Sequence, residues 1–170
     1  MSDPATRSDA PGDPAGGVLV IGYGNTLRTD DGVGPRVAEL LAGDPRLAGA
    51  TVRACHQLSP ELADDMRSAT LVVLVDATTE APPGAIVVRR VDLAGESRVD
   101  GGATSHHVDP GVLLALARDL YGATPAAHIV SVGVADLRLG EALSPGVAAA
   151  LPWAVEAVLR LVAQANAPSL

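Results

Sequence analysis

The chain has 170 residues, a formal net charge of −8, one Trp, two Tyr and no Phe, and its length fits one domain with a substantial core. The acidic balance and the few aromatic stacking surfaces argue against a nucleic-acid-binding protein, because such surfaces are normally basic. All twelve basic residues are arginine, and the lack of lysine excludes lysine Schiff-base chemistry and a Walker A phosphate loop.

The ends of the chain predict tails around a single folded unit. Residues 1–17 are rich in Pro, Asp, Ala and Gly and lack the apolar segment of a signal peptide, so we expect a disordered tail. The folded domain is expected over 18–165, with a short tail at 166–170. The single cysteine, Cys55, excludes an internal disulfide and fits a reducing compartment. Without an apolar run near the roughly 20 residues that span a bilayer, the chain is predicted to be cytoplasmic and membrane-free. The sequence has no exposed apolar heptad or symmetric patch, which predicts a monomer.

The first structured segment joins a buried strand to a helix through a glycine-rich turn. The apolar run Val18–Ile21 is typical of a buried parallel strand, and the turn begins at Gly22 and Gly24. The carboxylates of Asp30 and Asp31 follow at the mouth of the predicted helix. In an open α/β sheet this turn lies at the carboxyl edge, where ligands bind. The apolar residues expected on the helix are Val33, Val37, Leu40 and Leu41.

The remaining elements alternate between strand and helix. Strands are predicted over Thr51–His56, Leu71–Val75, Ala85–Val91 (near an edge) and His128–Val134. Helices are predicted over Pro60–Ser68 with Ser59 as N-cap, from Asp109-Pro110, and from Ser144-Pro145. The apolar stripe expected on the helix from Asp109-Pro110 is Val112, Leu113, Leu116 and Leu120. On the helix from Ser144-Pro145 the expected stripe is Val147, Leu151, Ala154, Val155, Val158 and Val162. This order predicts an α/β fold, a three-layer α/β/α sandwich with a mostly parallel sheet.

Three polar residues are predicted to meet at the carboxyl edge of this sheet. Asp31 closes the first turn, Asp76 follows the run Leu71–Val75, and His106 precedes the third helix. Two carboxylates and an imidazole suit a divalent first-row metal and leave coordination positions open for water or substrate. Taken singly, Asp31 can cap or complement its helix, Asp76 can cap a strand end, and His106 can be an ordinary loop histidine.

Other chemical groupings are weaker. Cys55 and His56 are neighbours on a predicted strand and point to opposite faces, so a thiol–imidazole pair is disfavoured. The sequence lacks the Gly-x-Ser-x-Gly elbow of serine hydrolases. The turn begins like a dinucleotide fingerprint, but Leu27 stands at the third glycine position and the acidic pair repels a pyrophosphate. His128 is expected at the opposite edge, in a structural role.

Residues 22–34 fill every fixed position of the pattern Gly-x-Gly-Asn-x-Leu-x-x-Asp-[Asp/Glu]-Gly-x-Gly. In this segment the chain resembles the hydrogenase maturation endopeptidases, which process the large subunit of nickel–iron hydrogenases. The apolar stretch that ends in Asp76-Ala77 and the segment Thr104-Ser105-His106 ahead of a helix also match that family. With Leu143-Ser144-Pro145 and the helix after it, the resemblance covers about residues 18–162.

The resemblance implies an endopeptidase, aspartic-type by family classification, that removes a C-terminal extension from a large-subunit precursor already holding nickel. It implies that Asp31, Asp76 and His106 bind this nickel, supplied by the precursor, and that Asp31 and Asp76 are the catalytic candidates. Asp31 stands where some members have Glu, and His107 beside His106 leaves open which imidazole is the ligand. Residues 56–62 replace the expected Gly-rich turn, which predicts a different large-subunit partner.

Two other function classes stay open. One is a non-catalytic relative that binds a hydrogenase subunit or a metal, although the complete set of Asp31, Asp76 and His106 argues against lost activity. The other is a small-molecule hydrolase or phosphorylase on a similar fold, which the lack of lysine and of a phosphate-binding loop disfavours. Assays with a precursor, or with ester and nucleoside substrates, distinguish these classes.

Overall fold

The computed structural model describes residues 17–93 and 108–168, and within them the strands and the longer helices follow one another in the predicted order. The strands are β1 (Val18–Tyr23), β2 (Thr51–Cys55), β3 (Leu71–Thr78), β4 (Ile86–Arg90) and β5 (Ala126–Gly133). The helices are η1 (Thr29–Gly32), α1 (Val33–Leu41), η2 (Pro45–Leu47), α2 (Leu62–Asp65), α3 (Pro110–Tyr121) and α4 (Pro145–Ala165).

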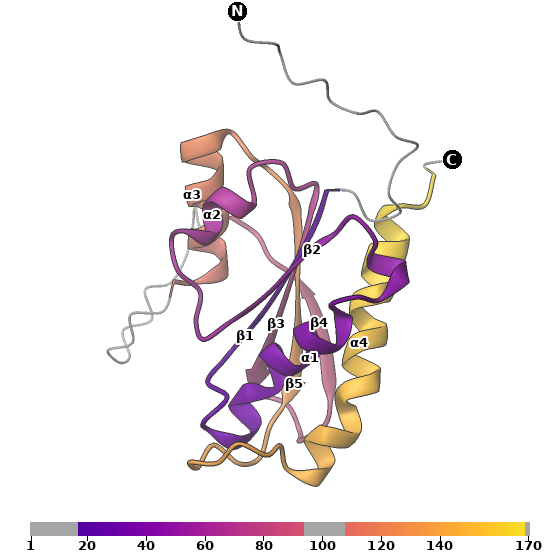
Figure 1. Cartoon of the computed structure of the whole chain (residues 1–170). Helices are drawn as coiled ribbons and strands as arrows, with labels where there is room; N and C mark the ends of the chain where they lie inside the picture. Colours follow the sequence, from indigo (N-terminus) through magenta and orange to yellow (C-terminus); the bar gives the residue numbers. More distant parts are fainter. Residues whose placement is uncertain (1–16, 94–107, 169–170) are drawn as a thin grey trace, which may run out of the picture.

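The five strands form one sheet in the order β2-β1-β3-β5-β4. The first four are parallel to their neighbours, and β4 pairs antiparallel with β5 at the edge of the sheet. Helices α1 and α4 cover one face, and α2 and α3 cover the other (Figure 1). The predicted three-layer α/β/α sandwich with a mostly parallel sheet, including its edge strand, is therefore confirmed.

Each face of the sheet contributes alternate strand residues to its own hydrophobic core. In β1, Val18 and Val20 pack under α1 and α4, whereas Leu19 and Ile21 pack under α2 and α3. All four side chains are buried, as expected for a central parallel strand covered on both faces. The sheet therefore gives the turns at its carboxyl edge a rigid base.

Three local predictions were wrong. Strand β3 continues to Thr78, so Asp76 lies within it, because Asp76 stays in register with Ser131 of β5. Helix α2 has only four residues, with Glu61 at its N-cap position, because residues 59–61 form a turn in which the Ser59 side chain bonds Glu61. The stripe of α3 is rotated: its apolar residues surround the helix, and those that face the sheet are Leu113, Leu114 and Ala117, whereas Val112 and Leu120 are exposed.

The two long helices begin as predicted. Asp109 caps α3 through a 2.7 Å hydrogen bond from the Gly111 amide to its Oδ1. Helix α4 packs Val147, Ala154 and Val158 into the core. By length and hydropathy alone, α4 also meets the criterion for a membrane span, which corrects the expectation that no stretch does so. A core helix satisfies the same criterion, and the buried stripe of α4 lies against the sheet.

Candidate active site

The two adjacent carboxylates in η1 have different environments. Asp30 is fully buried, and it accepts hydrogen bonds from the amides of Ala135 (3.1 Å), Asp136 (2.9 Å) and Ser144 (2.7 Å) and from the Ser144 hydroxyl (2.8 Å). Burial raises the pKa of Asp30, but these four bonds outweigh it and lower the pKa below its ordinary value. Asp31 is only partly buried, and its Oδ2 accepts from the Asn25 amide at 2.8 Å. Asp30 is therefore occupied by protein donors, while Asp31 keeps oxygen lone pairs for other partners.

Glycines let this turn fold closely against the strands. Gly24 has φ +147°, and a Cβ there would overlap the carbonyl oxygen of Asp31. A Cβ at Gly34 would overlap the carbonyl oxygens of Tyr23 and Val75. The backbone approach that brings Asp31 beside β1 therefore requires glycine.

Asp76 is held by two hydroxyl donors from neighbouring strands. The Tyr23 hydroxyl donates to Oδ2 at 2.8 Å, and the Ser131 hydroxyl donates to Oδ1 at 3.2 Å. Burial raises the pKa of Asp76 despite these bonds and the positive charge of Arg89, and the negative charge of Asp31 raises it further. Burial and the Asp76 charge also raise the pKa of Tyr23, so its hydroxyl stays protonated at neutral pH and remains a donor.

Tyr23 and Asp76 line two cavities. One, of about 200 Å³, is lined by Asp31 and Asp76 together with Tyr23, Gly24 and His56. The structure thus brings the two predicted carboxylates, which are distant in sequence, to one cavity. The other cavity, of about 380 Å³, also includes Tyr23 and Asp76 and extends towards Arg89, Arg90 and Asp109.

The third predicted ligand, His106, lies outside the described residues, as does His107, so its place at this edge stays a prediction. Within residues 17–93 and 108–168, no group of three or more His, Cys, Asp or Glu side chains is placed to hold a metal ion. The described part of the site is therefore a pair of carboxylates that presents oxygen donors to a shared cavity.

Sequence reasoning missed Tyr23, Ser131 and the burial of Asp30. Strand alternation gives a signal for Tyr23, which follows Leu19 and Ile21 on the same face of β1. Ser131 is found only from the register of β5 on β3. The bonds to Asp30 come from residues more than 100 positions away, for which the local pattern has no signal.

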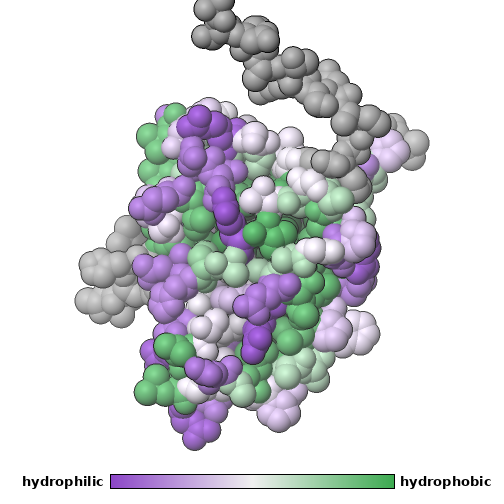
Figure 2. Space-filling view, viewed as in Figure 1, coloured by the Kyte–Doolittle hydropathy of each residue, from purple (hydrophilic) through white to green (hydrophobic). Residues whose placement is uncertain are grey.

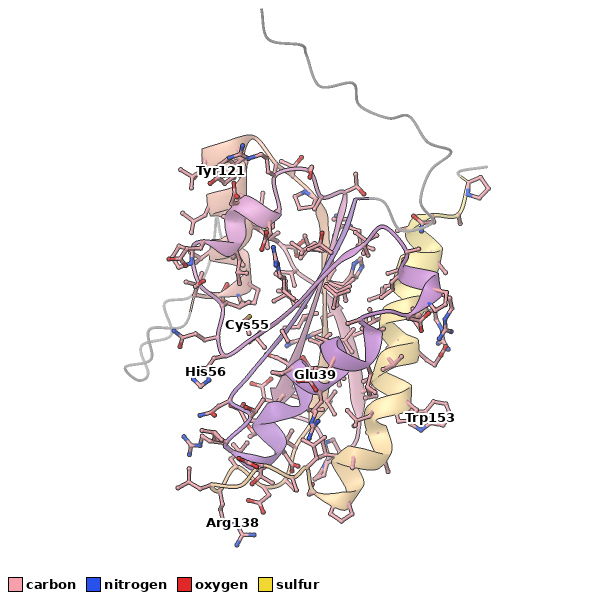
Figure 3. All side chains as sticks on the ribbon, viewed as in Figure 1. Glu39, Cys55, His56, Tyr121, Arg138 and Trp153 are labelled. Atoms are coloured by element: carbon pink, nitrogen blue, oxygen red, sulfur yellow. The ribbon has the colours of Figure 1, made fainter. Side chains whose placement is uncertain are left out.

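The cysteine is no nucleophile candidate in this geometry. Cys55 is partly buried, and burial raises the pKa of its thiol. His56 follows the end of β2, and Figure 3 shows its ring beyond the sheet while Cys55 stays between the layers. His56 instead lines the cavity of Asp31 and Asp76, which the sequence did not predict.

Solved structures of hydrogenase maturation proteins superpose on the chain over most of its length. The hydrogenase 2 maturation peptidase from Thaumarchaeota archaeon SCGC_AB-539-E09 has a TM-score of 0.64 and 29% identity and covers 85% of this chain and 97% of its own. The HycI protease of Thermococcus kodakarensis KOD1 has a TM-score of 0.67 and 18% identity, and the match covers 86% of this chain and 92% of the protease. The HybD endopeptidase of E. coli has a TM-score of 0.65 and 24% identity, and the match covers 87% of this chain and 93% of the endopeptidase.

The chain has the fold of the hydrogenase maturation proteases. The neighbours at 29% and 25% identity are a maturation peptidase and the HybD maturation protease of Thermococcus kodakarensis, which supports a protease role. No protein-family model and no curated protein sequence matches the chain. On the maturation-protease fold, the Asp31–Asp76 cavity lies at the carboxyl edge of β1 and β3, where ligands of open α/β sheets bind.

Proposed function

We propose that the chain is an endopeptidase that removes a C-terminal extension from the nickel-loaded precursor of a nickel–iron hydrogenase large subunit. The observation that carries the proposal is the placement of Asp31 and Asp76 on one cavity of a maturation-protease fold. We further propose that it acts in the cytoplasm, as a monomer, on its protein substrate.

The carboxylates supply the chemistry that hydrolysis needs. The oxygen of a water molecule adds to the scissile carbonyl carbon, the C–N bond breaks, and a proton is transferred to the leaving amine. We assign this proton transfer to Asp31 and Asp76, because carboxylates within reach of the reacting groups act as general bases and acids. The raised pKa of Asp76 favours a group that can both accept and return a proton.

The nickel belongs to the substrate in this proposal. Asp31, Asp76 and His106 are the residues proposed to contact it, and oxygen and imidazole donors are compatible with a divalent first-row ion. The two described carboxylates are polar, face a cavity and are not fully used by protein donors. They therefore have lone pairs available for an ion that arrives with the precursor.

Intact-mass spectrometry of a cognate precursor tests the proposal. Nickel-loaded and nickel-free precursor are incubated with wild type, with Asp76→Asn and with Asp119→Asn, a matched change at an exposed carboxylate on α3. We expect loss of the C-terminal peptide from nickel-loaded precursor with wild type and Asp119→Asn, and at least a 100-fold slower loss with Asp76→Asn. Binding of the precursor without any mass change would instead favour the non-catalytic module.

A further inference from the structure

Three exposed leucines lie on two neighbouring segments, one of which leads into the candidate site. Leu27, Leu137 and Leu139 are 56%, 37% and 87% exposed. Leu27 belongs to the turn after β1, and the other two belong to the loop 134–144 between β5 and α4. A parallel bridge between Arg28 and Gly140 places the two segments side by side. We call Leu27, Leu137 and Leu139 the leucine surface.

The leucine surface is built on an extensive set of hydrogen bonds. The Gly140 amide donates to the Leu27 carbonyl at 2.9 Å, and the Thr29 amide donates to the Gly140 carbonyl at 2.8 Å. The Arg28 side chain donates to the Leu137 carbonyl at 3.2 Å, and the Thr29 hydroxyl donates to the Arg138 carbonyl at 2.6 Å. The exposed leucines are thus held on a fixed backbone.

Buried Asp30 fixes both ends of the loop. It accepts from the amides of Ala135 and Asp136 after β5 and from both donors of Ser144 before α4. Because Asp31 follows directly in the chain, the turn that carries the candidate site and the loop that carries two leucines form one unit. A ligand bound on the leucine surface is therefore held in a fixed position relative to Asp31.

A shallow cavity of about 220 Å³ adjoins the leucine surface. Leu27 and Leu143 line it on the apolar side, and Arg36, Glu39 and Glu141 line it on the polar side. Figure 2 shows, at the lower end of the molecule, hydrophobic residues bordered by hydrophilic ones. An apolar contact area with a polar rim of both charge signs is the pattern of a protein-binding surface.

We propose that the leucine surface docks the folded body of the same precursor whose C-terminal extension is cut at Asp31 and Asp76. This inference rests on the proposed function. A second copy of this chain fits less well, because three leucines fall far short of the roughly 800 Å² per partner of a standard stable interface. A lipid surface would favour a basic border, whereas the adjoining cavity is lined by Glu39 and Glu141 as well as by Arg36. A transient protein substrate is the occupant that fits both the size and the placement.

The test compares Leu27→Ser, Leu139→Ser and the double variant with Leu120→Ser, an equally exposed leucine (62%) on α3. Cleavage of the nickel-loaded precursor is measured as KM and kcat, together with Tm and the sedimentation of each protein alone. We expect each substitution on the leucine surface to raise KM about tenfold, with kcat within about twofold, because truncation of a central apolar contact weakens binding by that order. Leu120→Ser should leave all values unchanged.

Each other outcome overturns the docking proposal in a distinguishable way. If wild type cleaves and the double variant has the wild-type KM, docking on the leucine surface is excluded while the proposed function stands. If Leu139→Ser converts a dimer to a monomer, the occupant is a second copy of the chain. If wild type neither binds nor cleaves a verified precursor, the proposed function and the docking proposal fail together.

Discussion

Asp30 and Ser144 join two segments that are 114 positions apart in the sequence through two hydrogen bonds. The Ser144 amide donates to Oδ1 of Asp30 at 2.7 Å, and its hydroxyl donates to Oδ2 at 2.8 Å. Ser144 occupies the N-cap position of α4, but its side chain makes no capping bond to that helix. The residue instead ties the start of α4 to the turn after β1.

Asp30→Asn is expected to destabilise the protein by about 2 kcal/mol or more, because hydrogen bonds to a buried charged group contribute roughly 1.5–3 kcal/mol each. The introduced amide can accept through one oxygen only, and its NH₂ group faces backbone donors. Urea unfolding measures the change. Asp119→Asn, at an exposed ion pair with Arg118, is the control and should change stability by less than about 0.5 kcal/mol. Equal stability of the two variants would contradict the role of Asp30.

Tyr23→Phe removes one of the two donors that orient Asp76 and leaves the ring packing intact. We expect kcat for precursor cleavage to fall about fivefold, with KM changed less than twofold, because a lost hydrogen bond of about 1 kcal/mol acts at the reacting carboxylate. Tyr121→Phe is the matched control, since Tyr121 packs beneath Arg67 on the far end of α3. A rise in KM alone would assign Tyr23 to substrate binding.

Gly24→Ala is expected to displace the turn that holds Asp31, because the added Cβ meets the Asp31 carbonyl oxygen and φ +147° is strained for alanine. Activity should fall at least 100-fold even if the fold survives, since a small misplacement of a catalytic group has that effect. Circular dichroism and the cleavage assay together separate these two effects. Gly146→Ala, where the space is open, should be neutral or stabilising by at most about 1 kcal/mol.

We expect the stability of the protein to depend on pH through His128, which lies away from the candidate site. Burial and the positive charge of Arg90 lower the pKa of His128 in the folded state, and its Nδ1 is buried without a hydrogen-bond partner among the described residues. The unfolded chain therefore binds more protons than the folded one below about pH 6.5, and stability falls as the pH drops through this range. In His128→Val the urea midpoint should decrease less between pH 7.5 and 5.5 than in wild type. If the urea midpoint of His128→Val decreases as much as that of wild type, His128 is not the cause of the pH dependence.

The sequence predicted the elements whose signal is local. The apolar runs in β1 and β3, the Asp109-Pro110 start of α3 and the Ser144-Pro145 start of α4 all occur as expected. The buried face of α3 was misjudged because its apolar residues surround the helix, and packing against the sheet and α2 decides which of them are covered. The length of β3 depends on its pairing with β5, which no local pattern encodes.

The candidate site was predictable only in part for the same reason. Asp31 and Asp76 follow from their positions after two apolar runs in the sequence, and the structure places both on one cavity. The pairing register of the strands brings the hydroxyls of Tyr23 and Ser131 to Asp76. The burial of Asp30 depends on the loop 134–144, which is distant in the sequence. The role of His106 stays a prediction.

The exposure of the single tryptophan determines how unfolding of this protein should be measured. Figure 3 shows Arg138 extending from the loop 134–144 and Trp153 extending from α4, where it is 71% exposed. Because Trp153 is the only tryptophan in the chain, its fluorescence reports on solvent at α4 and changes little on unfolding of the core. Unfolding is therefore better followed by circular dichroism.

The adjacency of Asp30 and Asp31 constrains how the chain can change in length. One carboxylate is enclosed by backbone donors and the next faces a cavity. Deletion of one residue between Gly24 and Asp30 would shift Asp31 into the buried position and bring Gly32 to the cavity, whereas insertion would bring Asp30 to the cavity and Thr29 to the buried position. The loop at Gly43, which has open space around it, has no such requirement. Homologous chains should therefore vary freely in length between α1 and β2 but keep a constant number of residues from Gly24 to Asp31.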